Sequence, residues 1–169
     1  MFKKGDAVVH PVCGAGVVVG LEELRRHGGL RRYYQIRLLG QSATSLMVPV
    51  KNAERVGLRL AISPSKLSQV WQVLCSAPNA LPADHKTRYE LLEHKLQAGD
   101  VLQTAEVVRD LAWRQQQKSG LTGRGKQIYQ RGMTLLASEI AAAQGIELAD
   151  ATVQVRARLS QGTSPKAAV

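Results

Sequence analysis

The sequence predicts an α+β protein of two domains, a small, strongly bent sheet or SH3-like barrel followed by an all-α bundle of about five helices. Residues 1–58 contain short β-branched and alternating stretches separated by turns rich in Gly and polar residues. From Leu58 onward the apolar residues recur at helical spacing with short interruptions. We therefore expect a first domain over 1–58, a helical domain over 59–160 and a disordered tail over 161–169.

The first domain has four stretches with the composition of strands. Val, Ile and Tyr either alternate with polar residues or form short apolar runs, and no stretch has helical length. The segment is also too small for an α/β enzyme domain. The expected strands are Ala7–His10, Gly16–Leu21, Tyr33–Leu39 and Thr44–Val50, with turns at Gly14, 25–32 and 40–43.

The connection RRHGGLRR, residues 25–32, carries four arginines around Gly28 and Gly29. Two interpretations of this hairpin tip are open. It is a solvated, charged turn, or it contacts phosphate or an acidic protein surface, for which the two-pronged geometry of arginine is suited.

The helical domain shows its helix starts clearly. Ser63 with Pro64 supplies a capping hydroxyl and a first-turn proline, and Asp84 supplies the next cap. These predict helices to about Ser76 and to about Ala98. Their expected inward residues are Leu67, Val70, Trp71 and Leu74 in the first helix, and Tyr89, Leu92 and Leu96 in the second.

The stretch 99–121 reads as a central packing helix, capped by Asp100 and ended by Gly120. Between its apolar positions, acidic and basic residues three and four apart are expected to pair along the helix. The apolar positions are Val101, Leu102, Ala105, Val108, Leu111 and Ala112, with Val107 at the margin, and the charged ones are Glu106, Arg109, Asp110, Arg114 and Lys118. A fourth helix is expected over 122–144 and a fifth over 147–159.

The charge balance is strongly basic. The chain has 23 Lys and Arg against 13 Asp and Glu, a net charge of +10, and both domains share the excess. Such a protein attracts polyanions, of which nucleic acid is the commonest in the cytosol. No apolar run approaches the roughly 20 residues that span a bilayer, and two cysteines are too few for a disulfide framework. We expect a cytoplasmic protein.

The sequence offers no catalytic constellation. His10 and Cys13 lie close together, but no second Cys/His pair is near, so a metal site is not expected. Neither Cys13 nor Cys75 has a recognisable base beside it, and Trp71 and Trp113 are expected in the core. We therefore expect no enzyme activity, no cofactor and no metal.

Two helix starts are candidates for binding an anion. His85, Lys86 and Arg88 open the second helix, where free N–H groups and the positive end of the helix dipole favour negative charge. The fourth helix opens with Arg124 and Lys126, and Arg131 follows about two turns on. If the bundle brings these starts together, they form one basic face for DNA phosphates; otherwise they are a solvated polar rim.

Four blocks of sequence carry a family resemblance. They are FKKGDAVVHPVCGAGVV, VPVKNAERVGLR, RYELLEHKLQAGD and AEVVRDLAWRQQQKSGLT. In this order they resemble the CarD/CdnL family of bacterial transcription regulators, up to about Leu159. The resemblance implies a Tudor/SH3-like domain that binds the RNA polymerase β subunit, as in the polymerase-interacting module of the transcription-repair coupling factor. It also implies a helical domain that contacts promoter DNA at the upstream edge of the bubble and slows bubble collapse.

The resemblance also implies contact residues, with two departures from the family. A family tryptophan that wedges into the minor groove aligns with His85, and arginines used against the β subunit align with Leu24 and Met47. Arg25 is expected to compensate at the first of these positions, and Met47 to make an apolar contact. The implied polymerase contacts are Leu24, Arg25, Arg37 and Met47, and the implied DNA contacts are His85, Lys86, Arg88, Tyr89, Arg124 and Lys126.

We expect a non-catalytic transcription regulator that acts as a monomer in the cytoplasm, associated with the nucleoid, with no membrane partner. Its partners would be the polymerase β subunit and promoter DNA. Two alternatives are open: a basic nucleoid or RNA-associated protein that does not touch polymerase, and a divergent paralogue of the family with a different partner.

Overall fold

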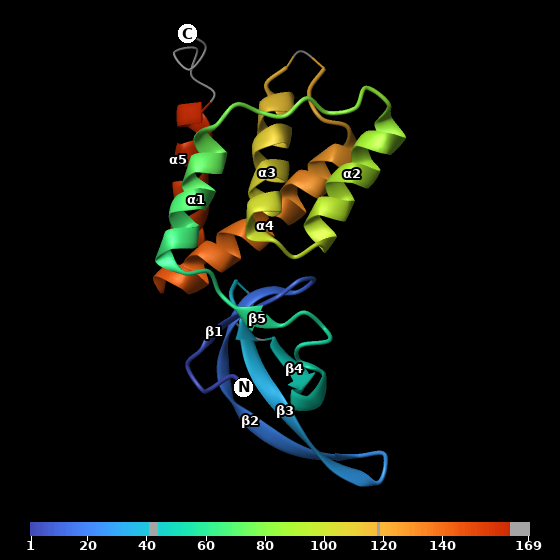
Figure 1. The fold of residues 1–169 in the computed structure, drawn as a ribbon, viewed down its shortest axis with the longest axis vertical. Helices are drawn as coiled ribbons and strands as arrows, with labels where there is room; N and C mark the ends of the chain where they lie inside the picture. The colour runs from blue at the N-terminus through green and yellow to red at the C-terminus, as the bar shows by residue number, and fades with distance from the viewer. Residues whose placement is uncertain (41–43, 118, 163–169) are drawn as a thin grey trace.

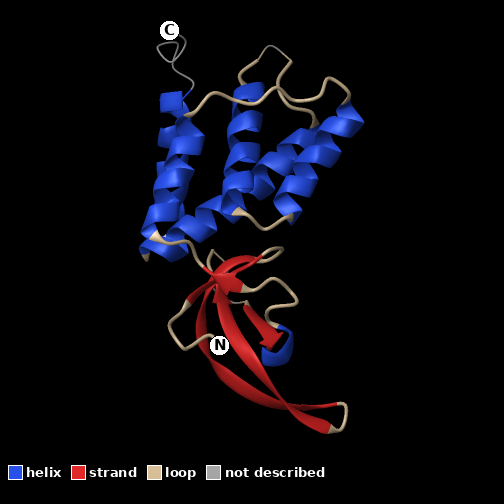
Figure 2. Cartoon of the chain, viewed as in Figure 1, coloured by secondary structure: helices blue, strands red, loops and turns tan. Residues whose placement is uncertain are grey.

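The sheet and the helices form two domains stacked along the long axis of the molecule (Figure 1). The computed structural model describes residues 1–40, 44–117 and 119–162. Within these residues, strands occupy one end and five α-helices the other (Figure 2), and the fourth helix contacts the sheet domain through residues of its C-terminal half, such as Ser138 and Glu139. The predicted α+β class and the order of its two parts are confirmed. The predicted turn residues 41–43, Lys118 and the tail residues 163–169 lie outside the described residues.

The sheet domain is a five-stranded antiparallel sheet with strand order β4-β3-β2-β1-β5. One face is apolar because every second residue turns inward. The strands are β1 (Ala7–His10), β2 (Gly14–Arg26), β3 (Gly29–Leu38), β4 (Ser45–Pro49) and β5 (Arg59–Leu60), with a 3-10 turn at Val50–Asn52. Their core comprises Val8, Val18, Tyr34, Ile36, Leu38, Val48, Ala53 and Leu58. Since β5 pairs with β1, the sheet continues two residues beyond the boundary expected at 58.

The β2–β3 hairpin is longer than the sequence predicted. β2 was expected to end at Leu21, but the ladder continues to the pair of Arg26 with Gly29. His27 and Gly28 both have positive φ, 50° and 78°, as a two-residue hairpin turn requires. The sequence did not predict this extension, because its residues are mostly polar. Beyond the core neither face of the ladder is buried, so apolar and polar residues do not alternate there. The hairpin therefore projects away from the helices (Figure 1).

The helices begin at the caps that the sequence supplied. The side chains of Ser63, Asp84, Asp100 and Thr122 each accept a backbone N–H of the first turn that follows. The helices are α1 (Pro64–Cys75), α2 (His85–Gln97), α3 (Val101–Gln115), α4 (Gly123–Gln144) and α5 (Leu148–Gly162). α5 therefore includes Gln161 and Gly162, which were expected in the tail.

α3 is the central helix, as predicted, but it ends at Gln115 instead of near Gly120. It is buried on two sides: Val101, Ala105 and Val108 pack in a cluster with α1, α4 and α5, while other residues pack with α2 and α4. Trp113 was expected in the core, yet 40% of it is exposed. It lies about 100° around the helix from the buried Ala112, outside both apolar stripes.

Arg109 and Asp110 of α3 are buried, which corrects the predicted surface pairing along this helix. They pair with each other at 2.9 Å. Arg109 also donates to the hydroxyl of Ser76 at 2.8 Å, and Asp110 accepts the backbone N–H of Asn79 at 3.0 Å. The pair therefore fixes the connection between α1 and α2. Glu106 pairs across to Lys95 of α2 at 2.7 Å.

None of the helices in the described part of the chain combines the length and the apolar composition needed to cross a membrane.

Candidate nucleic-acid and protein interfaces

The N-terminal ends of α2 and α4 lie together, as the basic-face hypothesis requires. The hydroxyl of Tyr89, one turn into α2, is hydrogen-bonded to the hydroxyl of Thr122, the cap of α4. Thr122 in turn accepts the N–H of Gly125 at 3.3 Å, and Asp84 caps α2 by accepting the N–H of Thr87 at 2.9 Å. Two positive helix-dipole ends therefore meet at one end of the molecule.

Arg124 connects these two ends across the surface. Its guanidinium lies 5.3 Å from the centroid of the Tyr89 ring and pairs with Glu93 of α2 at 2.9 Å. About half of the Arg124 side chain remains exposed. The pair with Glu93 offsets part of the positive charge that Arg124 would offer to a phosphate.

Arg88 is buried, which corrects its expected role as a DNA contact. Only 1% of it is exposed. Its guanidinium donates to the carbonyls of Pro82 and Ala83 at 3.0 and 3.2 Å and meets Nδ1 of His85 at 2.8 Å. A side chain so enclosed cannot reach a phosphate outside the protein. It fixes the segment that leads into α2 and orients His85.

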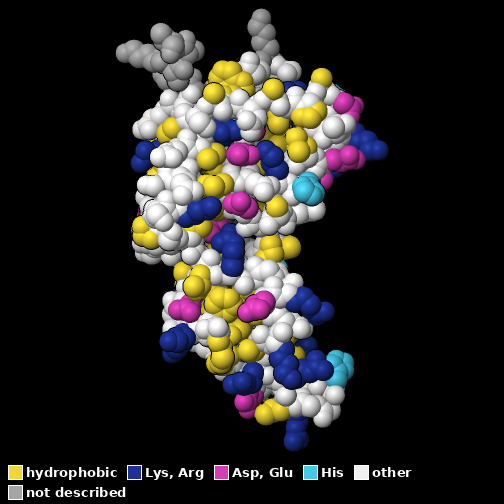
Figure 3. All heavy atoms as spheres, viewed as in Figure 1, with side chains coloured by type: hydrophobic (Ala, Val, Ile, Leu, Met, Phe, Trp, Pro, Cys, Tyr) yellow, Lys and Arg dark blue, Asp and Glu magenta, His cyan; other side chains and the backbone are white. Residues whose placement is uncertain are grey.

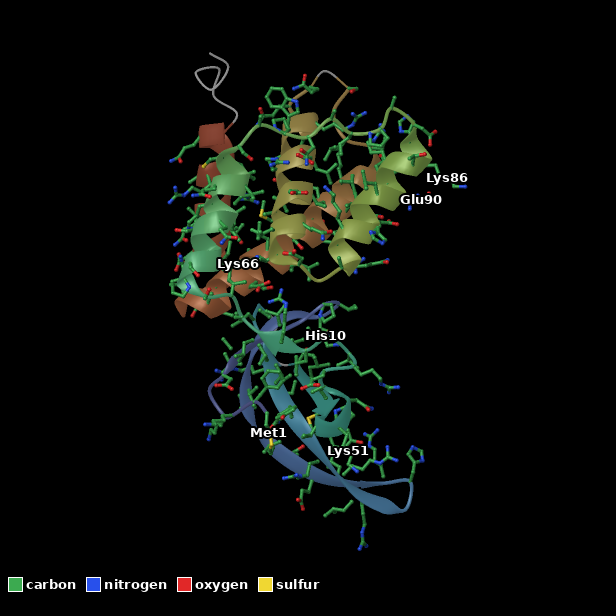
Figure 4. All side chains as sticks on the ribbon, viewed as in Figure 1. Met1, His10, Lys51, Lys66, Lys86 and Glu90 are labelled. Atoms are coloured by element: carbon green, nitrogen blue, oxygen red, sulfur yellow. The ribbon has the colours of Figure 1, made fainter. Side chains whose placement is uncertain are left out.

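Tyr89 is also largely enclosed, with 7% exposed, and its hydroxyl is engaged by Thr122. The exposed residues of this site on α2 are His85 and Lys86. Because the guanidinium of Arg88 can only donate, Nδ1 of His85 accepts, and the proton of the neutral ring lies on Nε2. Lys86 projects from the outer tip of α2 into solvent (Figure 4).

Lys126 is not part of the same face as Arg124. The two residues are about 200° apart around the helix. Arg124 lines a groove with Glu93 of α2, whereas Lys126 lines a groove of about 400 Å³ with Arg156 of α5. The candidate nucleic-acid site therefore comprises His85, Lys86, Arg124 and the two helix ends.

The Asp84 cap carries the clearest electrostatic signature of the site. The N–H of Thr87, and next its hydroxyl, hold the pKa of the Asp84 carboxyl below its ordinary value. The carboxylate thus stays ionised at the N-terminal end of α2, where it stabilises the helix and offsets part of the positive charge of that end. The N-terminal end of α4, capped by the uncharged Thr122, lacks this offset.

On the sheet domain, strand register separates the expected polymerase contacts. Side chains that pair across neighbouring strands lie on one face. Leu24 pairs with Arg31, and Met47 pairs with Gln35. Since 31, 35 and 37 are alternate positions of β3, Leu24, Arg37 and Met47 share the face opposite the core.

Arg25 pairs with Leu30 and therefore lies on the other face of the hairpin from Leu24. It does not stand beside Leu24, the position at which it was expected to compensate. Arg31, directly opposite Leu24 in the ladder, places a guanidinium on that face instead.

The hairpin also forms a basic groove that the sequence did not reveal. Its volume is about 380 Å³, and its lining contains Arg31, Arg32 and Lys51 with no acidic residue. Lys and Arg side chains gather over this end of the molecule (Figure 3). The RRHGGLRR segment signalled the arginines. The contribution of Lys51 depends on the β3–β4 pairing, which no local pattern contains.

His10 and Cys13 have a structural role. Nδ1 of His10 accepts the N–H groups of Val12 and Cys13 at 3.2 and 3.1 Å, closing the turn after β1. Burial lowers the pKa of His10. Within the residues that the structure describes, no three His, Cys, Asp or Glu side chains gather closely enough to hold a metal ion.

Comparison with known proteins covers both domains. The sequence model of the family described as CarD-like/TRCF RID domain matches residues 2–62. The model described as CarD, C-terminal domain matches residues 69–156, more than half of the chain. A Bacillus subtilis (strain 168) protein named "Putative transcription factor YdeB" is 27% identical over 146 residues, which are 86% of this chain and 94% of that protein.

Proposed function

The chain belongs to the CarD family, and from this premise we propose that it binds the RNA polymerase β subunit with its sheet domain and stabilises the promoter open complex with its helical domain. Membership in this family supports a role as a transcription regulator. The observation that best supports the proposed DNA contact is the joined pair of helix N-termini at Tyr89 and Thr122, beside exposed Lys86 and Arg124.

The DNA contacts in this proposal are to phosphates, without sequence readout. Helix N-termini and cations bind phosphate regardless of the base sequence. His85 adds an N–H donor where the resemblance implies a tryptophan wedge. We expect it to contact the rim of the bubble by hydrogen bonding, with little of the unstacking that an inserted ring produces.

The polymerase contact in this proposal is the sheet face that contains Leu24, Arg31, Arg37 and Met47. The two arginines outnumber Glu22, which pairs with Tyr33 on the same face, so this face stays positive although Leu24 and Met47 are uncharged. The basic groove beside it extends the same surface. Such a surface is complementary to an acidic patch on the partner, and half-buried Leu24 and Met47 supply apolar contact area.

Tethering explains why weak DNA contacts suffice. A polymerase-bound sheet domain raises the local concentration of the helical domain at the promoter. The protein then shifts the equilibrium towards the open complex only by the difference between its affinities for the open and closed states. One molecule per polymerase is enough, and such a protein acts in the cytoplasm with the nucleoid.

Binding to a purified β-subunit fragment tests the proposal. Arg31→Glu should weaken binding at least about tenfold, because it places a like charge against the acidic partner. Arg25→Glu, with the same charge change on the opposite face of the same hairpin, is the matched control and should change binding little. If the unsubstituted chain retains DNA but neither β fragment nor polymerase at moderate salt, the proposal fails and a nucleoid protein independent of polymerase is favoured.

A further inference from the structure

Arg59 of β5 joins three segments at the junction of the two domains. Its Nη1 and Nη2 donate to the two carboxylate oxygens of Glu139 on α4 at 2.6 and 2.9 Å. Its Nε and Nη2 donate to the carbonyl of Gly99, between α2 and α3, at 3.3 and 2.8 Å. One side chain of the sheet domain thus holds two parts of the helical layer.

The acidic partner of this clamp is almost fully enclosed. Only 4% of the Glu139 side chain is exposed, against 36% for Arg59. The hydrogen bond to Glu139 raises the pKa of Arg59. A carboxylate buried at this depth is held in place by a two-pronged partner, and the geometry of that pair is far more restricted than that of a surface pair.

The surroundings of the clamp are closely packed. The N–H of Ala15 in β2 donates to the hydroxyl of Ser138 on α4 at 3.2 Å, in a buried position. Gly14 has a φ of +87°, and a Cβ there would lie 3.2 Å from the same hydroxyl. Between the domains, around Arg59 and Glu139, the remaining cavity is only about 20 Å³. The contacts around Arg59 and Glu139 are therefore tightly packed, whereas an open cleft of about 640 Å³ lies between α4 and residues of β3 and β4 on another part of the junction. The cleft leaves room for the domains to move if the packed contacts are lost.

Domains of one chain move relative to each other unless their interface prevents it. We propose that Arg59 is a positioning residue, which with Glu139 and Gly99 fixes the angle between the sheet domain and the helical domain. The consequence for transcription rests on the proposed function. When the sheet domain is bound to polymerase, the fixed angle between the domains holds the N-terminal ends of α2 and α4 at one place on the DNA. With a loose junction, the same helix ends would sample a larger volume at lower effective concentration.

The geometric part is tested by measuring a distance between the domains with spin labels. Labels are attached to cysteines introduced at the exposed Glu23 of β2 and Glu90 of α2, after Cys13 and Cys75 have been replaced by Ser. The clamp predicts a single narrow distance distribution in this otherwise unsubstituted chain. A broad distribution already in this chain would overturn the proposal.

Arg59→Gln/Glu139→Gln removes both charges together and leaves no buried carboxylate unpaired. The distance distribution of this variant should become at least about twofold broader, because a shorter, neutral amide replaces the four hydrogen bonds that the guanidinium donates across the junction. Arg55→Gln, an exposed position in the same domain, is the control and should keep the narrow distribution. An unchanged width in the double variant would overturn the proposal.

The functional part is tested with the same variant, without labels. Its binding to the β fragment and to a short DNA duplex should stay within about twofold, whereas the extension of open-complex lifetime should fall roughly tenfold as effective concentration is lost. A broader distance distribution with full lifetime extension would overturn the positioning role. If the unsubstituted chain extends no lifetime, the proposed function fails, while the spin-label result still decides whether the junction is rigid.

Arg59→Lys covers the case in which the double variant does not fold. Lysine keeps the charge towards Glu139 but cannot hold Glu139 and Gly99 at once with fixed geometry. The variant should fold, with a distance distribution broader than that of the unsubstituted chain and a partial loss of lifetime extension. If lysine preserved both the narrow distribution and the full lifetime, the requirement for the guanidinium would be refuted.

Discussion

Replacing the buried Arg88 with Met tests whether this residue supports the candidate site or touches DNA itself. Methionine fills similar space but loses the hydrogen bonds to Pro82, Ala83 and His85. Ala83 and His85 are exposed and their acceptors can bind water instead, so we expect a loss of about 2 kcal/mol, the contribution of roughly one hydrogen bond to a charged group. If the 169 residues unfold as one cooperative unit, this loss of stability lowers Tm by roughly 4–8 °C. Urea unfolding should show a lower midpoint at an unchanged slope.

Lys86→Met provides the matched comparison, since the same side chain is introduced two residues earlier at an exposed position. Its stability should change by less than about 0.5 kcal/mol. Its DNA affinity should fall, and the slope of log affinity against log salt should drop by about 0.9, the value for one lost phosphate contact. Lys66→Met, on α1 away from this end (Figure 4), should leave that slope unchanged.

The two positions should therefore give opposite results. Arg88→Met should keep the salt slope of DNA binding while losing stability, and Lys86→Met should do the reverse. The reasoning is refuted if Arg88→Met leaves the urea midpoint unchanged and removes one unit of salt slope, because its guanidinium would then have to reach a phosphate.

Glu93→Gln should strengthen binding to a short DNA duplex about two- to fivefold at low salt, because it frees Arg124 from an exposed pair, and no gain in titration would show that Arg124 does not contact DNA. Asp84→Asn should make the free energy of unfolding fall less steeply as pH is lowered. Because the pKa of Asp84 is lowered in the folded state, its stabilising contribution is present above about pH 4 and is lost as pH falls through the folded pKa. The measurement is the urea midpoint as a function of pH, and a fall at acid pH as steep as in the unsubstituted chain contradicts the prediction. His85→Trp should lengthen open-complex lifetime further by adding a wedge, and unchanged lifetimes would indicate that this helix end does not face the bubble.

Helix starts and the core could be predicted because their determinants are local. Ser63 and Asp84 are capping residues, and a cap acts within its own first turn. The spacing of Tyr89, Leu92 and Leu96 likewise predicted which side of α2 is buried, and all three are. Helix ends were less certain: α3 stops five residues before Gly120, since Gln116 and Gln117 are exposed and gain no packing by continuing the helix.

The burial of charged residues was the main feature that the sequence did not predict. Arg88 stands four residues before Leu92 and eight before Leu96, so it continues the same buried stripe, and this spacing could have revealed it. Its charge suggested solvent because arginine is seldom fully buried. Arg59 and Glu139 lie 80 residues apart and meet only when β5 and α4 come together, so no local pattern predicts their contact.

The distribution of charge along the molecule favours a bridging role over a single nucleic-acid surface. The buried and half-buried cations, such as Arg59 and Arg88, are bonded to the protein itself. Of the exposed cations, Arg31 lies on the hairpin at one end of the molecule and Lys86 at the tip of α2, far from it (Figures 1 and 4). Two separate anionic partners can therefore bind, one at each end, and the clamp proposed at Arg59 would hold their two binding sites at a fixed distance from each other.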